Sequence, residues 1–198
     1  MCRFVESIQL NEGVFKRLDL HQERVCKAMK DFYPTKKVIE LAEYMNQLSF
    51  PVEGVYKCRL VYDSVIRIIE FTPYIPRKIQ TLRMVKTGMD STPYKKEDRN
   101  LLNEAYALRG DCDDIIMLKD GLITDTSFTN IALFDGINWV TPRIPLIYGV
   151  NRKELLNTGV LTEKDITPKE LMNFKLISLF NAMNEFGSIE LDISAIRQ

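Results

Sequence analysis

The sequence predicts an α+β protein of two lobes. Of the 198 residues, 45% are hydrophobic, enough for a buried core in one large domain or in two small ones. Segments with the helical period and segments with strand character occur in both halves of the chain. The most loop-like stretch, KTGMDSTP at residues 86–93, separates the halves. We therefore predict a small lobe at residues 1–85, a linker at 86–93 and a larger lobe at 94–198.

The first half combines strands with two amphipathic helices. Its strand candidates are rich in Val, Ile and Leu, and turn residues or prolines separate them, which favours antiparallel neighbours. Apolar residues at every third or fourth position mark the helices, and a proline follows each of them. The predicted elements are, in order, strands at 4–10 and 14–15, helices at 18–32 and 36–49, and strands at 55–62, 65–72 and 79–85.

The second half is mostly strand. Gly110 is a stop signal for the helix that follows the linker, and Lys-Asp-Gly and Asp-Gly turns connect the next strands, which predicts a meander. The predicted elements are a helix at 96–109, strands at 115–118, 122–124, 130–134 and 139–141, a helix at 151–158, a shorter helix after Pro168 and a strand at 174–180.

Composition excludes several classes of protein. The 27 basic residues balance 27 acidic ones, whereas a nucleic-acid or anionic-membrane binder needs a basic excess. The sequence contains no apolar run near the ~20 residues of a membrane span. Its start, MCRFVESIQL, lacks the features of a signal peptide. We expect a cytoplasmic protein that acts on a small molecule and binds neither nucleic acid nor membrane.

Cysteine and histidine offer little chemistry. The four cysteines contain no CxxC pair, and His21 is the only histidine, so we predict no metal site. No GxSxG nucleophile elbow, Walker loop or Rossmann fingerprint is present. Any demanding reaction must therefore depend on Lys, Asp, Glu, Arg or Tyr side chains, or on a bound cofactor.

Two segments of the second half contain candidate binding groups. Asp125 stands among threonine and serine hydroxyls, which would favour its charged form, keep its pKa low and let it hold a positive ring nitrogen. A capped turn is the alternative interpretation. Gly149-Val150-Asn151-Arg152 immediately precedes a predicted helix, whose free N–H groups, next to a glycine, would form a site for phosphate. Every helix has such an end, so this signal is not specific.

Basic residues supply the remaining candidates. Lys95 and Lys96 stand at the start of a predicted helix, whose dipole would lower the pKa of a buried lysine and make it a nucleophile. A solvated surface pair is the alternative. Arg24, one turn after His21, is either a surface residue or a phosphate ligand. Arg59 lies in an otherwise apolar strand and needs an anion, from an internal carboxylate or from a substrate.

These segments occur in an order that resembles a known family. The run GLITDTSFTN, a strand, an Asp-Gly turn, Thr141-Pro142 and Gly149-x-x-Arg152 are similar to the signature of the class IV, fold-type IV pyridoxal-phosphate enzymes. The opening FVESIQLNEGVFKRLDLHQERV resembles the family's first strand, hairpin and helix. The resemblance spans nearly the whole chain. It implies a two-lobed fold like that of D-amino-acid aminotransferases and the cofactor pyridoxal 5'-phosphate.

The resemblance also implies roles for the reacting groups. Lys95 matches the lysine that carries the cofactor, and Lys96 is the second choice. Asp125 stands where the family usually has glutamate and would face the nitrogen of the pyridine ring. Because aspartate is one methylene shorter, the cofactor or the backbone must lie closer to it.

The other matched residues would hold anions. Arg24 corresponds to the arginine that grips the cofactor phosphate, and Val150 and Asn151 correspond to the pair whose N–H groups bind it. Arg59 resembles a strand arginine that meets the substrate carboxylate in some members. The resemblance further implies a homodimer, because the family builds its active site near a subunit interface.

The reaction remains open between related chemistries. The first expectation is a lyase of folate biosynthesis that converts 4-amino-4-deoxychorismate to 4-aminobenzoate and pyruvate. The close alternative is an aminotransferase of branched-chain or D-amino acids. A third alternative is a protein that keeps the fold without the activity.

Overall fold

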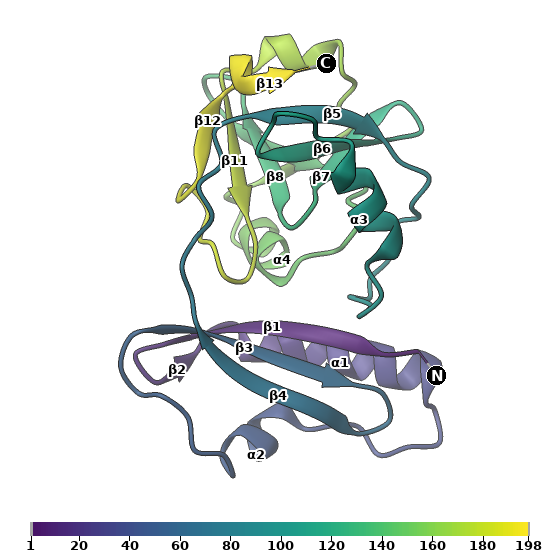
Figure 1. The fold of residues 1–198 in the computed structure, drawn as a ribbon, viewed down its shortest axis with the longest axis vertical. Coiled ribbons are helices and arrows are strands. Elements are labelled where there is room, and N and C mark those ends of the chain that lie inside the picture. The colour runs from purple at the N-terminus through teal and green to yellow at the C-terminus, as the bar shows by residue number, and fades with distance from the viewer. Residues whose placement is uncertain (1, 198) are drawn as a thin grey trace. The chain divides into compact units, whose positions relative to one another are not determined.

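The computed structural model describes residues 2–197, which form two compact units (Figure 1). Unit 1 contains the residues up to Pro76 together with Pro93–Asp98, and unit 2 contains Arg77–Thr92 and the residues from Arg99 onward. The chain thus divides at Pro76, before the predicted linker at 86–93, and returns once to unit 1. The mixture of helices and several sheets confirms the predicted fold class.

Unit 1 is a four-stranded antiparallel sheet in the order β2-β1-β3-β4. Two helices pack on one face of this sheet (Figure 1). Its core joins Phe4 and Ile8 of the first strand to Val25 and Met29 of the first helix. The elements are β1 (Phe4–Asn11), β2 (Val14–Phe15), α1 (Leu18–Phe32), α2 (Leu41–Met45), β3 (Val55–Tyr62) and β4 (Ile66–Pro73).

The second predicted helix is much shorter than its apolar stripe indicates. Helix α2 covers Leu41–Met45, whereas the sequence predicted 36–49. The Gln22 side chain explains the late start, because its amide donates to Ile39 O at 2.9 Å and accepts from Leu41 N at 2.7 Å. These backbone groups are the ones that a longer helix would have paired internally.

Unit 2 consists of two sheets with their apolar faces together. One sheet has the order β13-β5-β6-β7 and the other β10-β9-β8-β11-β12. The elements are β5 (Leu82–Lys86), α3 (Asn100–Ala107), β6 (Asp114–Lys119), β7 (Leu122–Thr126), β8 (Asn130–Phe134), β9 (Trp139–Pro142), α4 (Val150–Asn157), β10 (Thr162–Lys164), the short 3₁₀ turns η1 (Glu170–Asn173) and η2 (Ile193–Ala195), β11 (Leu176–Phe180), β12 (Glu190–Asp192) and β13 (Ile196–Arg197).

Side chains alternate between the two faces of each strand, so each sheet of unit 2 has a second apolar face, and a helix packs on that outer face. Ile116 belongs to the core between the sheets, whereas its neighbours Ile115 and Met117 pack in the cluster that contains Leu102 of α3. On the second sheet, Ala132 belongs to a cluster that includes Leu155 of α4. The two sheets and their two helices thus form a layered unit that holds the loops between them in fixed positions.

Two predicted pairings are wrong. The expected meander divides between the two sheets, because β6 pairs with β7 and β8 pairs with β9, while β7 and β8 lie in different sheets. The strand predicted at 79–85 is β5, which pairs in parallel with β6 in unit 2 and does not extend the first sheet. In both cases the local pattern is that of a strand, but the partner is set by packing far along the chain.

The helix predicted at 96–109 begins only at Asn100. Residues 95–97 are instead extended and pair with β1: Val5 N donates to Lys95 O at 2.8 Å, and Glu97 N donates to Arg3 O at 3.0 Å. The short strand β2 covers only the far end of β1, so the edge near Phe4 is open to this segment. Edge pairing therefore takes the backbone groups that would have started the helix.

None of the helices within residues 2–197 is long and apolar enough to cross a membrane.

Candidate active site

The predicted site residues fall into two groups, one in each unit. Lys95, Arg24 and Arg59 belong to unit 1, and Asp125 and the start of α4 belong to unit 2. In unit 1, Arg24 contacts the buried carboxylate of Glu6, whereas Lys95 and Arg59 bond to other residues. In unit 2, the buried carboxylate is that of Asp125 itself.

Lys95 lies in the extended segment that pairs with β1. Its Nζ donates to Ser7 Oγ of β1 at 3.0 Å, and its side chain is half-buried, whereas Lys96 is exposed. Successive side chains of an extended segment point to opposite sides, so only one of these two lysines can reach Ser7. The predicted placement of the two lysines at the start of a helix is wrong, because α3 begins only at Asn100.

Arg24 is held by Glu6, a residue that the sequence interpretation missed. Arg24 Nε donates to Glu6 Oε1 at 2.8 Å, and its Nη2 forms a second bond to Oε2, which completes a two-pronged ion pair. His21 Nδ1 lies 2.5 Å from the same Oε2. A glutamate inside the apolar run FVESI was the available signal, because a buried carboxylate requires a partner.

Charges in this cluster are strongly coupled. Burial by itself would raise the pKa of Glu6, but the charge of Arg24 and the hydrogen bond to His21 outweigh it and lower the pKa to about 2. Burial lowers the pKa of His21, which favours the neutral ring. Glu6 is therefore ionised at neutral pH and fixes the orientation of the Arg24 guanidinium.

Arg59 finds its anion within unit 1. Its guanidinium pairs with Glu97 at 3.1 Å and with Glu70 at 3.4 Å. The sequence predicted that the anion for Arg59 would come from an internal carboxylate or from a substrate, and the structure provides internal carboxylates. Its contact with a substrate carboxylate stays a prediction.

Asp125 is the buried carboxylate of unit 2, with 5% of its surface exposed at the end of β7. Asn130 Nδ2 donates to its Oδ1 and Ile147 N donates to its Oδ2, both at 2.9 Å. Burial nevertheless raises its pKa to about 6, against these bonds and the positive charge of Arg152. The low pKa predicted for Asp125 is therefore wrong.

The neighbouring hydroxyls do not reach this carboxylate because they bond elsewhere. Thr126 and Thr129 Oγ1 atoms bond to each other at 2.7 Å across the loop between β7 and β8. Thr124 Oγ1 donates to Met117 O at 2.9 Å. The hydroxyls thus build the capped turn that was the alternative interpretation, while more distant residues hold Asp125.

Asn130 connects Asp125 to the segment before α4. The same Nδ2 also donates to Ile147 O at 2.9 Å. A Cβ atom at position 149 would lie only 2.0 Å from Asn130 Oδ1, so the glycine is required by close approach. Asn130 stands in the sequence motif, but the motif alone assigned it no role.

The start of α4 has the features of an anion site. Gly149 precedes the helix and provides no side-chain cap, and Val150 and Asn151 are buried in its first turn. The first N–H groups of a helix have no partner within it. Asn151 Nδ2 donates to Asn181 O at 2.8 Å, so its side chain anchors the helix and its backbone N–H is the group suited to bind phosphate.

The close approach at Gly149 gives a direct test. We expect Gly149→Ala to destabilise the protein by about 1–3 kcal/mol, because the new Cβ must displace the Asn130 side chain from a tightly packed position. Urea unfolding measures the loss. Gly159→Ala is the matched control. A Cβ at position 159 would contact no other atom, but Gly159 has a positive φ, so the free energy lost there reports backbone strain alone. A thermal scan in which Gly149→Ala matches the wild type would contradict the assigned packing.

Comparison with known proteins identifies the family. The model of the family described as Amino-transferase class IV matches residues 64–190. The chain belongs to this family. An uncharacterized protein of Haemophilus influenzae is 31% identical to it over 187 residues, which cover 93% of this chain and 99% of that protein.

Solved structures share the fold. A proposed 4-amino-4-deoxychorismate lyase from Haemophilus somnus is 28% identical, with a TM-score of 0.86 over 93% of this chain and 98% of that one. A hypothetical aminotransferase from Mycobacterium tuberculosis in its PLP-bound form is 14% identical, with a TM-score of 0.73 over 93% and 78% of the two chains. As a member of this class, the chain is a pyridoxal-phosphate-dependent class IV enzyme, which confirms the predicted enzyme class and cofactor.

Proposed function

We propose that this enzyme is a lyase that converts 4-amino-4-deoxychorismate to 4-aminobenzoate and pyruvate, a step of folate biosynthesis. The similarity to the Haemophilus somnus protein supports this reaction, because it extends over 93% of this chain. We further propose that the enzyme acts as a homodimer in the cytoplasm, following the family resemblance.

The observation that carries the proposal is the burial and raised pKa of the Asp125 carboxylate, which bear on cofactor binding. Its carboxylate is buried, held by two donors, and has a pKa raised to about 6, so no cation among residues 2–197 fully compensates its charge. A protonated pyridine nitrogen is a positive, planar group that would stabilise this charge. The donor set of unit 2 therefore fits pyridoxal phosphate, which supplies an electron sink when bound.

The chain's other residues have separate tasks in this proposal. The half-buried Lys95 amine would carry the cofactor and afterwards move the proton at the substrate α-carbon. Arg24, fixed by Glu6, and the N–H groups of Val150 and Asn151 would hold the phosphate. These groups would keep the ring in place while bonds of the substrate change.

A single assay separates the two reactions. The cofactor-loaded enzyme is incubated with 4-amino-4-deoxychorismate in the absence of any 2-oxo acid, and 4-aminobenzoate and pyruvate are measured. We expect the two products in equal amounts. Turnover that requires a 2-oxo acid acceptor would replace the lyase with an aminotransferase. A protein that takes up cofactor without turning over either kind of substrate would favour the fold without activity.

A further inference from the structure

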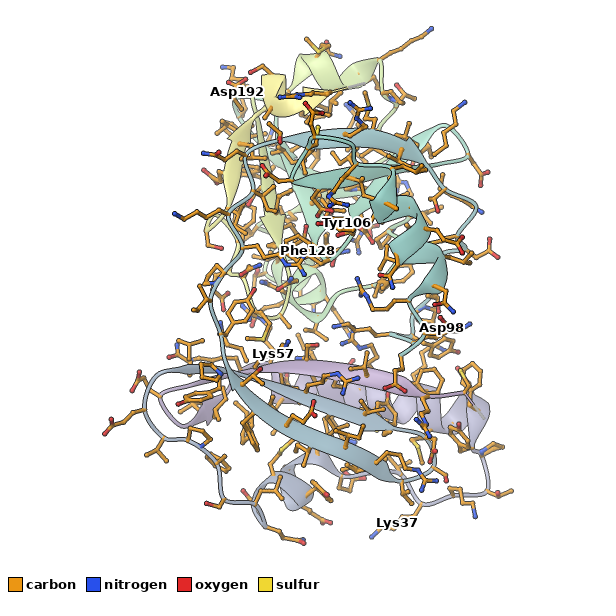
Figure 2. The ribbon with its side chains drawn as sticks, viewed as in Figure 1. Lys37, Lys57, Asp98, Tyr106, Phe128 and Asp192 are labelled. Atoms are coloured by element: carbon orange, nitrogen blue, oxygen red, sulfur yellow. The ribbon has the colours of Figure 1, made fainter. Side chains whose placement is uncertain are left out.

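Two exposed arginines of unit 2 approach the loop that follows Asp125. Arg99 Nη2 donates to Ser127 O at 2.9 Å. The Arg77 guanidinium lies over the ring of Phe128, with Cζ 4.9 Å from the ring centroid. Phe128 is labelled in Figure 2. Because Ser127 and Phe128 are consecutive, the two guanidinium groups contact the same short loop.

Among the described residues, neither charge has a carboxylate in direct ion-pair contact. Within residues 2–197, the structure shows no ion pair for Arg77 or Arg99, whose contacts are those with the loop. Four other arginines of unit 2 do form ion pairs: Arg83, Arg143, Arg152 and Arg197. Partial burial, and then the positive charge of Arg77, lower the pKa of Arg99, so the two guanidinium groups are close enough to repel each other.

Asp114 is a buried acidic group whose charge acts on both arginines. Asp114, the first residue of β6, has no exposed surface, and no hydrogen bond of normal geometry reaches either of its oxygens. Burial raises its pKa, which the hydroxyls of Ser127 and Thr126 and the charge of Arg77 offset only in part. Even when Asp114 is ionised, its single charge cannot balance two guanidinium groups, so the cluster carries an excess of positive charge.

We propose that Arg77 and Arg99 bind a carboxylate carried on a planar ring, with the Phe128 ring holding the Arg77 guanidinium in place. Guanidinium groups match a carboxylate with paired donors, and an anion would relieve the repulsion between them. Aromatic rings pack favourably against other planar groups. The inference rests on the proposed function, whose substrate and product both carry a ring carboxylate. In contrast, Arg59 already has two internal carboxylates.

The test compares two probes that differ only in the carboxylate. Binding of 4-aminobenzoate and of aniline to the cofactor-loaded enzyme is measured by titration calorimetry. We expect Arg77→Gln and Arg99→Gln each to weaken 4-aminobenzoate about tenfold or more and to leave aniline unchanged, because a charge-assisted hydrogen bond is lost. Melting temperatures confirm that each variant is folded.

The matched control is Arg109→Gln. Arg109 also stacks on an aromatic ring, with Cζ 4.2 Å from the centroid of Tyr106, but it follows the end of α3 and its hydrogen bond goes to Tyr106 O instead of the loop after Asp125. We expect it to bind both probes as the wild type does. Equal binding of 4-aminobenzoate by the wild type and both loop-contacting variants would overturn the proposal.

Failure of this site and failure of the proposed function give different results. Arginine-dependent binding of 4-aminobenzoate, without its formation from 4-amino-4-deoxychorismate, would support the carboxylate site and reject the lyase. Formation of 4-aminobenzoate with an unchanged KM in Arg77→Gln and Arg99→Gln would support the lyase and reject the site.

Discussion

Lys95→Ala is expected to lower turnover by at least about 1,000-fold, because one amine serves both as the nucleophile for the cofactor and as the group that moves a proton. The fold should be retained, since the side chain is only half-buried, donates a hydrogen bond to Ser7 and is not part of the hydrophobic core. Borohydride reduction followed by peptide mass spectrometry measures cofactor attachment independently of activity. We expect the label on Lys95 in the wild type and none in the variant.

Lys96→Ala is the matched control for this experiment. Lys96 is the adjacent residue, is exposed and points to the opposite side of the extended segment. We expect its label, visible absorbance and turnover to match those of the wild type. A label on Lys96, together with an active Lys95→Ala enzyme, would transfer the role to the second choice and remove Lys95 from the site.

Local patterns in the sequence were sufficient for the first part of the fold. The Asn-Glu-Gly turn sets the β1–β2 hairpin, and the apolar stripe from Leu18 gives α1 with His21, Val25 and Met29 buried as its period requires. Strand β3 also has its predicted bounds, Val55–Tyr62. In each case the signal and the structure it determines lie within a few residues of each other.

The setting of the site residues could not be read in the same way. Lys95 is extended because a distant strand edge at Phe4 and Val5 captures its backbone. Asp125 has a raised pKa because its partners include the backbone of Ile147, 22 residues away, while the adjacent hydroxyls bond elsewhere. The types of residue and their order along the chain indicated the candidate site residues. Their ionisation, however, depends on hydrogen-bond partners that tertiary packing brings from distant segments.

Asp125→Asn is expected to lower turnover by about 100- to 1,000-fold, because it removes the charge proposed to stabilise the protonated ring nitrogen while keeping the size of the side chain. Asp125→Glu restores the charge with one added methylene and should recover part of this loss, within the limits of a tightly packed site. Steady-state kinetics on the three enzymes measure the series. Equal activity of Asp125→Asn and wild type would remove Asp125 from the proposed cofactor site.

The pH dependence of the free energy of unfolding tests the raised pKa of Asp125 without an activity assay. Its pKa is raised from 3.8 to about 6, so the folded cofactor-free protein binds this proton more tightly than the unfolded chain does. The associated stability is complete below about pH 4 and is lost as the pH rises through about 6, by about 3 kcal/mol in total. Urea unfolding should show this loss in the wild type relative to Asp125→Asn. Bound cofactor should reduce it, because a cation beside the carboxylate lowers its pKa, whereas parallel profiles of the two cofactor-free proteins would contradict the raised pKa.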